Sequence, residues 1–418
     1  MREFAADALR WADHVRPGDL VVWGQACAEP TTLTEGLMAG RHAIGGRFSV
    51  FVGIGFAETL RPEHADVVDV RSYCATGGNR RLVAAGRLDI LPSHYSALSR
   101  QIAGSADVLL LQLAPTGDPD RFSFGLACDY LQPAVARART VIAEVNDQVP
   151  VTRSDWTISA EEIDVVVRTS RSPALAPAAP AGPLDAAIAA NVADLVPDGA
   201  TLQVGLGGMP AAVVDALSGH RDLGVHSGLL NPSLVRLIAS GGVTNARKGR
   251  ADSASVVGLI AGDVETFRFC HDNPEIKLAP TSYTHDRDVL ARLPAFTAIN
   301  AAIEVDLAGQ INAEVAGSRY VGAVGGATDF LRGAAASDGG LPIVALPSSI
   351  MAKDGRRVGR IVPRLSGPAS VARADAGVIV TEFGHADLRG RTDRERRNAL
   401  IAIAHPELRE ALERAGAD

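Results

Sequence analysis

A chain of 418 residues is long enough for two or three domains with sizeable cores. Its hydrophobic content of 47%, charged content of 21% and 42 glycines indicate a globular, loop-rich α/β protein and argue against a disordered or fibrous chain. The net charge of -7 argues against a nucleic-acid partner, which would require a basic face.

The cysteines and the chain ends carry few special signals. The four cysteines are far apart and form no CxxC pair, so we expect neither a metal site nor a disulfide framework. Apolar runs stay too short to span a membrane, and residues 1–20 do not resemble a signal peptide. These features together predict a cytoplasmic enzyme with no membrane partner.

The order of elements at the start of the chain occurs a second time. We predict an amphipathic helix from residue 5, a turn at 17–19, a strand at 20–23, a loop to Pro30 and a helix through Leu37. Residues 185–217 repeat this order at an offset of 180 residues, so that Pro197, Pro210 and Leu217 correspond to Pro17, Pro30 and Leu37. The shared offset indicates two related domains, although the same order of elements is common in α/β proteins.

The composition changes between the two copies. Residues 170–183 are rich in Ala and Pro, which predicts an extended linker between a domain at 1–169 and a domain at 184–418. Strand-like apolar runs recur in both domains with helical patterns between several of them, which predicts mainly parallel sheets. These runs cover 48–54, 107–113, 140–145, 278–283, 296–303, 342–346 and 377–381.

A pair of glycines separates an apolar run at 320–324 from a predicted helix at 329–336. Gly325 and Gly326 allow backbone amides to approach a ligand closely at a helix N-terminus, where phosphate or a developing oxyanion is favoured. Gly207 and Gly208 occupy a similar loop in the second copy of the repeat. The alternative for both pairs is a tight turn without a ligand.

Several segments together resemble the acetyl-CoA hydrolase/transferase family, which includes CoA-transferases acting on 4-hydroxybutyrate and butyrate. The segments are 299–314, 322–330, 380–384, 403–406, 28–30, 144–150 and 205–210. The resemblance covers nearly the whole chain. It implies two tandem CoA-transferase-like α/β domains, coenzyme A bound as an acyl-CoA substrate, a small carboxylate as candidate second substrate, and a homo-oligomer.

The resemblance also implies a reaction that this chain does not match fully. In transferases of the family, a glutamate after a His-Ser pair attacks the acyl-CoA carbonyl, but here Gly228 follows His226 and Ser227. Glycine has no carboxylate with which to attack. Three outcomes remain: hydrolysis by water, which we favour, transfer through another carboxylate such as Glu304 or Glu29, or binding of acyl-CoA without turnover.

Candidate catalytic residues are expected where strands end. His226 and Ser227 follow a short strand around Val225, His285 follows the predicted strand at 278–283, and Glu304 follows the one at 296–303. If these strands are parallel neighbours, the side chains open onto one edge of the sheet. An imidazole with a near-neutral pKa suits a general base for water. Each residue has the alternative of an ordinary hydrogen bond at a turn, and Ser227 and Gly228 are expected to contact substrate.

Two further groups are assigned to ligand binding. Gln25 and Glu29 lie in the first strand-to-helix loop and are expected to line an acyl pocket, although Glu29 also suits an interaction with the helix macrodipole. Lys353, with arginines at 356, 357 and 360, follows the strand at 342–346 and is expected to meet the phosphates of coenzyme A. The alternative for this basic group is a solvated loop.

Overall fold

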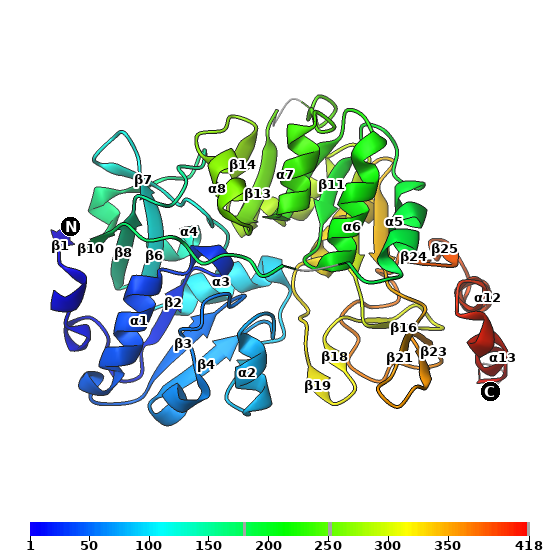
Figure 1. Ribbon diagram of the computed structural model, residues 1–418, viewed down its shortest axis with the longest axis horizontal. Coiled ribbons are helices and arrows are strands. Elements are labelled where there is room, and N and C mark those ends of the chain that lie inside the picture. Colours follow the sequence, from blue (N-terminus) through cyan, green and yellow to red (C-terminus); the bar gives the residue numbers. More distant parts are fainter. Residues whose placement is uncertain (179–180, 250–252, 416–418) are drawn as a thin grey trace. The chain divides into compact units, whose positions relative to one another are not determined.

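A computed structural model describes residues 1–178, 181–249 and 253–415. The chain forms two compact units (Figure 1). Unit 1 comprises Met1–Pro177, Gly228–Pro232 and Ala254–Thr284, and unit 2 comprises Ala178–Ser227, Ser233–Ser253 and His285–Asp418. The first change of unit falls inside the predicted linker, of which residues 179 and 180 lie outside the described ranges. The sequence did not predict that two later segments group with unit 1.

Unit 1 is built on a parallel sheet with the strand order β1-β10-β8-β6-β2-β3-β4-β5. The strands are β1 (Arg2–Glu3), β2 (Leu20–Trp23), β3 (Phe48–Val52), β4 (Val68–Ser72), β5 (Asp89–Ile90), β6 (Val108–Pro115), β8 (Thr140–Asn146) and β10 (Val165–Thr169). The short strands β7 (Arg121–Ser123) and β9 (Ile158–Ser159) pair antiparallel beside β6. The apolar runs predicted near residues 48, 107 and 140 are thus confirmed as strands. They read as continuous apolar runs because helices cover both faces of the sheet.

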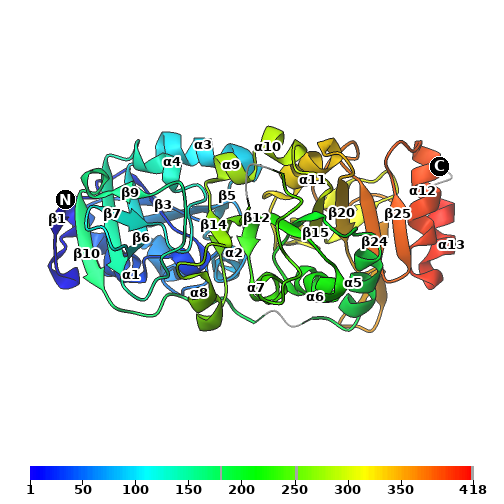
Figure 2. The ribbon, with the colours of Figure 1, turned by 90° about the horizontal axis from the view of Figure 1, so that it is seen from above.

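Helices lie on both faces of the unit 1 sheet (Figure 2). Helix α1 (Thr31–Gly40) covers one face, while α3 (Tyr95–Ser105) and α4 (Gln132–Val135) cover the other. Leu33 and Leu37, four residues apart, bury one side of α1 against the strands. Helices α2 (Asn79–Ala84), α8 (Val264–Cys270) and α9 (Thr281–Thr284) complete the unit with strands β13 (Ser255–Ile260) and β14 (Ile276–Leu278).

Two local predictions in unit 1 are wrong. Residues 5–16 form two 3₁₀ turns, Ala6–Ala8 and Trp11–Asp13, instead of an α-helix. Leu9 and Trp11 are both buried, and residues two apart would lie on different sides of an α-helix. The predicted strand at 278–283 ends at Leu278 and is followed by α9, because Pro280 has no N–H for a sheet and suits the start of a helix.

Unit 2 contains the strand order β12-β11-β15-β20-β24-β25. The strands are β11 (Thr201–Val204), β12 (Gly224–Leu230, of which 228–230 belong to unit 1), β15 (Phe296–Ala301), β20 (Leu341–Ala345), β24 (Val378–Thr381) and β25 (Gly384–Asp387). All pair in parallel except β25, which runs antiparallel to β24. The predicted parallel arrangement is therefore confirmed. We call the edge at which these parallel strands end the carboxyl edge of unit 2.

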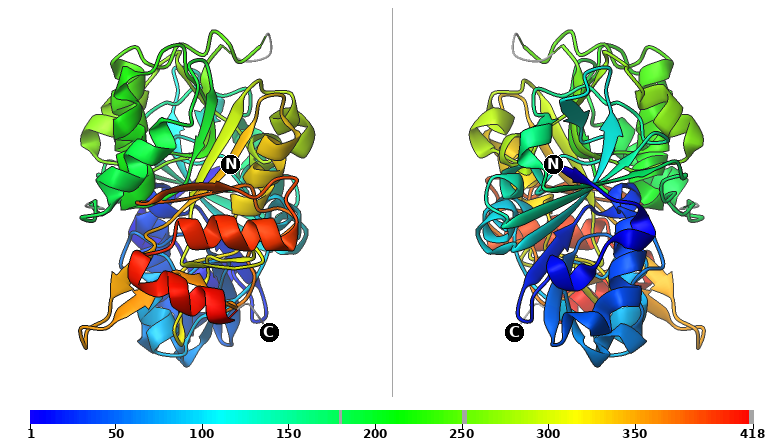
Figure 3. Two further views of the ribbon diagram at one scale, coloured as in Figure 1. Left: turned by 90° about the vertical axis from the view of Figure 1, so that its right-hand side faces the viewer. Right: turned by 90° about the vertical axis from the view of Figure 1, so that its left-hand side faces the viewer.

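Helices again cover both faces of the strands. Helices α5 (Asp185–Ala193) and α6 (Gly208–Ala216) lie on one face, while α10 (Arg287–Ala291) and α11 (Ala327–Ala336) lie on the other (Figure 2). Helices α12 (Asp393–Ala402) and α13 (Pro406–Ala415) lie side by side next to β25 (Figure 3). The remaining elements are α7 (Pro232–Ala239), β16 (Glu304–Asp306), β17 (Ile311–Asn312), β18 (Val315–Ala316), β19 (Arg319–Tyr320), β21 (Ser349–Met351), β22 (Arg357–Gly359) and β23 (Ile361–Val362).

The internal repeat matches the architecture of each unit. In unit 1, β2 is followed by α1 and lies between β6 and β3. In unit 2, β11 is followed by α6 and lies between β15 and β12. Both predicted starts thus form an internal strand followed by a helix. No helix in the described ranges is both long and apolar enough to cross a bilayer.

Candidate active site

Two side-chain amides join neighbouring strands at the carboxyl edge of unit 2. Asn300 on β15 donates to Gln203 Oε1 on β11 at 2.9 Å, and Gln203 Nε2 donates back at 3.4 Å. After β11 the chain turns through Gly207, whose φ of 124° suits only glycine, and α6 begins at Gly208. The expected glycine loop at a helix start is present. Contact of its amides with coenzyme A stays a prediction.

A second glycine turn leads into α11. Gly325 has a φ of 57°, and Gly326 forms the N-cap of the helix without a side-chain cap. The first amides of α11 therefore lack an intrahelical acceptor, as at every helix start. Contact of these amides with a thioester oxygen stays a prediction.

His285 packs directly against the second glycine turn. A Cβ atom at position 326 would lie 2.6 Å from His285 Nε2, so the imidazole occupies the space that glycine leaves. The ring also stacks at a tilt on Phe330, with 4.3 Å between ring centroids. Burial, with a smaller contribution from His226, lowers the pKa of His285 to about 3. The imidazole is therefore neutral and a much weaker base than the near-neutral imidazole that we expected.

His226, Ser227 and Gly228 lie within β12 instead of after it, which corrects their expected placement. His226 is buried and meets Phe296 edge-on, with 6.4 Å between ring centroids. The Ser227 hydroxyl lies 3.3 Å from both the backbone N and O of Val204, which ties β12 to β11. Because side chains alternate along a strand, a side chain at position 228 would project from the same face of β12 as His226.

The Glu304 carboxylate is already engaged by loops of unit 2. Its oxygens accept hydrogen bonds from Asn312 Nδ2 at 3.0 Å, from the N and Oγ of Ser366 at 2.7 and 2.9 Å, and from Gly367 N at 3.3 Å. Burial favours a raised pKa for Glu304, but these hydrogen bonds outweigh it and hold the pKa below the usual value. This geometry suits a positioning residue better than a nucleophile.

Two other carboxylates of unit 2 are engaged in the same way. Glu314 accepts from Ser370 Oγ at 2.8 Å and from Tyr320 OH at 3.1 Å. Glu382 accepts from the N and Oγ of Ser348 at 2.8 and 2.7 Å. Their oxygens join loops that are far apart in sequence. The sequence analysis assigned no role to Glu314 or Glu382, and no local sequence pattern marks Ser348 or Ser370 as their partners.

In unit 1, the Gln25 side chain is fixed by a buried polar cluster that the sequence did not reveal. Its Oε1 accepts from Tyr73 OH and Ile54 N, both at 2.9 Å. Its Nε2 donates to Tyr95 OH at 2.5 Å and to Asp129 Oδ2 at 2.7 Å. Burial raises the pKa of Asp129 to about 6. The amide has thus used its four hydrogen-bonding positions, so its expected contact with substrate is limited to its apolar atoms.

Gln25 and Glu29 line an open pocket of about 290 Å³ in unit 1. Its wall also includes Trp23, Phe56 and Asn79. Glu29 Oε1 accepts from Thr34 Oγ1 at 2.9 Å, and burial raises the pKa of the Glu29 carboxyl. The prediction that Glu29 lines a pocket agrees with this geometry, while the identity of the ligand stays a prediction.

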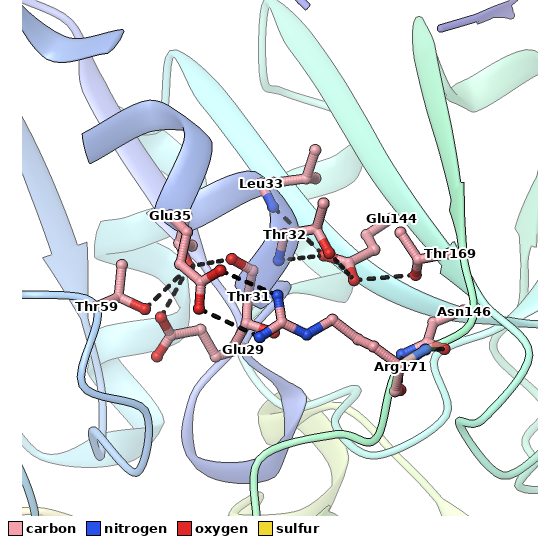
Figure 4. A network of polar contacts seen from close by, with 11 residues as sticks. Glu29, Thr31, Thr32, Leu33, Glu35, Thr59, Glu144, Asn146, Thr169 and Arg171 are labelled. Carbon is pink, nitrogen blue, oxygen red and sulfur yellow. Dashed lines mark hydrogen bonds and ion pairs between the residues drawn. The ribbon is translucent and has the colours of Figure 1, made fainter. Parts of the chain in front are cut away.

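The carboxylate of Glu144, a residue of β8, lies at the N-terminus of α1 (Figure 4). The sequence suggested Glu29 as the acid at this helix start. The Glu144 carboxylate accepts from Thr32 N at 2.9 Å, Thr32 Oγ1 at 2.8 Å, Leu33 N at 3.4 Å and Thr169 Oγ1 at 3.0 Å. It therefore satisfies the first amides of the helix and complements its dipole. Arg171 reaches Glu35 on the same helix with both terminal nitrogens.

Among the residues that the structure describes, two cations of the basic group after β20 have an acidic partner and two have none. Arg356 pairs with Asp354 at 2.8 Å, and Arg357 pairs with Glu407 at 3.1 Å. Lys353 lies exposed between β21 and β22. Arg360 lies between β22 and β23 and is half-buried. Contact of Lys353 with coenzyme A stays a prediction.

The cysteines offer no nucleophile. All four are buried free thiols, and burial raises the pKa of Cys27 and of Cys270 to about 12. Such thiols carry almost no thiolate at neutral pH. Across the part of the chain that the structure describes, no group of three His, Cys, Asp or Glu side chains is placed to hold a metal ion.

Comparison with known proteins identifies the class to which this fold and site belong. Residues 5–175 match the acetyl-CoA hydrolase/transferase N-terminal domain, and residues 262–416 match the acetyl-CoA hydrolase/transferase C-terminal domain. This protein therefore belongs to the acetyl-CoA hydrolase/transferase family. The resemblance seen in the sequence is confirmed.

Its relatives include both transferases and hydrolases. The chain is 35% identical over 402 residues to a 4-hydroxybutyrate coenzyme A transferase of Clostridium kluyveri, covering 94% of this chain and 92% of the relative. The crystal structure of RipA from Yersinia pestis is similar with a TM-score of 0.90 and 32% identity, covering 100% of this chain and 97% of that one. An acetyl-CoA hydrolase of Eremothecium gossypii is 33% identical over 218 residues, covering 50% of this chain and 39% of the relative.

Proposed function

We propose that this protein hydrolyses acyl-CoA thioesters, with water as the acyl acceptor. The observation that carries the proposal is Gly228, which stands where the family resemblance places the attacking glutamate of transferases. Without a carboxylate there, no glutamyl anhydride or glutamyl thioester forms at this position. The enzyme then has to bring water to the carbonyl.

The carboxylates around the carboxyl edge support this proposal. Glu304, Glu314 and Glu382 each accept hydrogen bonds from two or more donors, so none is available to attack without breaking these contacts. For Glu304, hydrogen bonds also hold the pKa low, which makes the carboxylate a weaker nucleophile.

We assign the remaining steps of the reaction to the glycine turn and to His226. The amides after Gly325 and Gly326 polarise the thioester carbonyl, an effect commonly worth about 3 kcal/mol per donor. Water attacks the carbonyl carbon and gives a proton to His226, the C–S bond breaks, and the imidazolium returns the proton to the CoA thiolate. His285 remains neutral and supports the turn, because its pKa is too low for it to act as the main base.

A second candidate is a CoA-transferase that uses Glu29. This alternative is favoured by one observation: Glu29 is a buried carboxyl that lines an open pocket. Binding of acyl-CoA without turnover is the third possibility.

One experiment separates the three functions. The purified protein is incubated with acyl-CoA, with and without acetate, and free thiol and new acyl-CoA species are measured. Hydrolysis releases free CoA without acetate and is insensitive to borohydride. Transfer requires acetate, produces acetyl-CoA and is inactivated by borohydride, and E29Q should then abolish it. Saturable CoA binding with neither product would refute both enzymatic proposals.

The missing carboxylate is tested by restoring it. G228E should introduce acyl transfer to acetate that borohydride inactivates, while the matched variant G228Q, of similar size but without a carboxylate, should not. A folded G228E protein that binds acyl-CoA but transfers nothing would show that more than one group of the transferase site has changed.

A further inference from the structure

Arg360 is a partly desolvated cation that lies beside the carboxyl edge of unit 2. Its guanidinium is half-buried, and it makes no hydrogen bond or ion pair with any residue in the ranges 1–178, 181–249 and 253–415. Burial lowers the pKa of Arg360, and attraction by Glu304 offsets only part of this effect. A guanidinium has five N–H donors, so this arrangement leaves strong hydrogen-bonding capacity unused.

The other partly buried arginines in the described ranges donate to an acceptor of the chain, either an acidic side chain or a backbone oxygen, as Arg409 does to Ala404 O at 3.0 Å. Arg41 pairs with Asp66 at 2.8 Å, Arg139 with Asp19 at 2.5 Å, and Arg357 with Glu407 at 3.1 Å. Arg357 lies only three residues before Arg360. Removing a cation from water without supplying an acceptor is unfavourable, so the unpaired guanidinium of Arg360 requires a separate explanation.

The protein holds Arg360 in place without neutralising it. Its backbone N–H donates to Ser348 O, and its backbone O accepts from Val305 N, both at 2.8 Å. Ser348 follows the carboxyl end of β20, so these bonds fix Arg360 beside the carboxyl edge. Glu304 is the nearby acid, but its oxygens are engaged by Asn312, Ser366 and Gly367. Within the described ranges, Arg360 therefore has no ion-pair partner, and Glu304 supplies only an attraction without direct contact.

We infer that Arg360 binds an oxyanion carried by the substrate, either a phosphate of coenzyme A or a carboxylate. A planar guanidinium recognises both groups through paired hydrogen bonds. This inference deepens the proposed function and rests on it for the nature of the ligand. It selects Arg360 from the basic group, since Arg356 and Arg357 already have acidic partners.

The inference is tested by binding measurements, which do not depend on turnover. We compare the wild type, R360Q and the matched control R357Q by calorimetric titration with CoA, dephospho-CoA, uncharged pantetheine and glutarate. Loss of a charge-assisted hydrogen bond should weaken binding of the recognised anion by about 10- to 100-fold in R360Q. R357Q should bind every probe as the wild type does, and R360K should recover part of the affinity.

The probes distinguish the two sources of the anion. Weaker binding of CoA with unchanged binding of pantetheine and glutarate assigns Arg360 to a phosphate. Weaker binding of glutarate alone assigns it to a carboxylate. A folded R360Q protein that binds all four probes with wild-type affinity overturns the inference. By contrast, a protein that binds CoA through Arg360 but releases no thiol from acyl-CoA contradicts only the proposed hydrolysis.

Discussion

Replacing Gly326 with alanine tests whether His285 must lie against the glycine turn. Gly326 has a φ of -91°, which alanine adopts without strain. The added Cβ would lie 2.6 Å from His285 Nε2, 2.9 Å from its Cδ2 and 3.3 Å from Phe330. Because His285 is only 5% exposed, the ring has little space into which it can move. The substitution therefore acts through the position of the imidazole and the turn.

The expected size of the effect follows from this overlap. Overpacking a buried site by one methyl group costs about 1–3 kcal/mol of stability. Displacing the turn by a fraction of an ångström should lower kcat/KM for thiol release from acyl-CoA by about 10- to 100-fold, since misplacement by 1 Å costs roughly a hundredfold. We would measure the free energy of unfolding in urea and kcat/KM with a thiol reagent.

Gly104 supplies the matched control. It lies in α3 and does not have a positive φ, and a Cβ atom added there would have no atom within 4 Å beyond its own helix backbone. G104A should keep wild-type activity and gain up to about 1 kcal/mol of stability from the higher helix propensity of alanine. If G326A is folded and hydrolyses acyl-CoA at the wild-type rate, the contact between the turn and His285 has no part in the reaction.

Two further predictions concern buried charge and pH. E144Q should lower the free energy of unfolding by about 1.5–3 kcal/mol, because it removes a carboxylate that accepts hydrogen bonds from the first turn of α1. E35Q, which breaks an exposed ion pair with Arg171, should lower it by at most about 1 kcal/mol. Equal effects of the two substitutions in urea unfolding would contradict this prediction. The pKa of His285 falls from 6.5 to about 3 on folding, so the unfolded chain binds a proton that the folded protein does not between these values, and stability should decrease as the pH falls through this range. H285N should remove up to about 1.4 kcal/mol per pH unit of this slope, and identical slopes in the two proteins would refute the assignment.

Local patterns of the sequence were sufficient for much of the fold. The apolar runs at 48–54, 107–113, 140–145 and 342–346 all became strands, because sheets covered by helices on both faces require continuous apolar stretches. The segment at 278–283 failed because its apolar residues are divided between a strand and a helix at Pro280. A short apolar run does not distinguish these two structures.

At the candidate site, too, the sequence predicted local features but not the contacts between distant residues. Glycine at positions 207, 325 and 326, and glycine in place of a carboxylate at 228, were readable from the sequence because each property belongs to one residue and its neighbours. The surroundings of the polar side chains were not readable. Glu304 accepts hydrogen bonds from Ser366, 62 residues later in the chain, and no local sequence pattern predicts such a pairing.

By itself, the sequence determined the repeated α/β order, the parallel strands, the glycine turns and the family. Tertiary structure alone decided that 228–232 and 254–284 group with unit 1, that His285 is held neutral, and that Arg360 forms no ion pair with an acid of the described ranges. Secondary structure follows from short-range periodicity and backbone preferences. Burial and hydrogen-bond partners depend on segments that meet only after folding, and these set the charge and reactivity of each group.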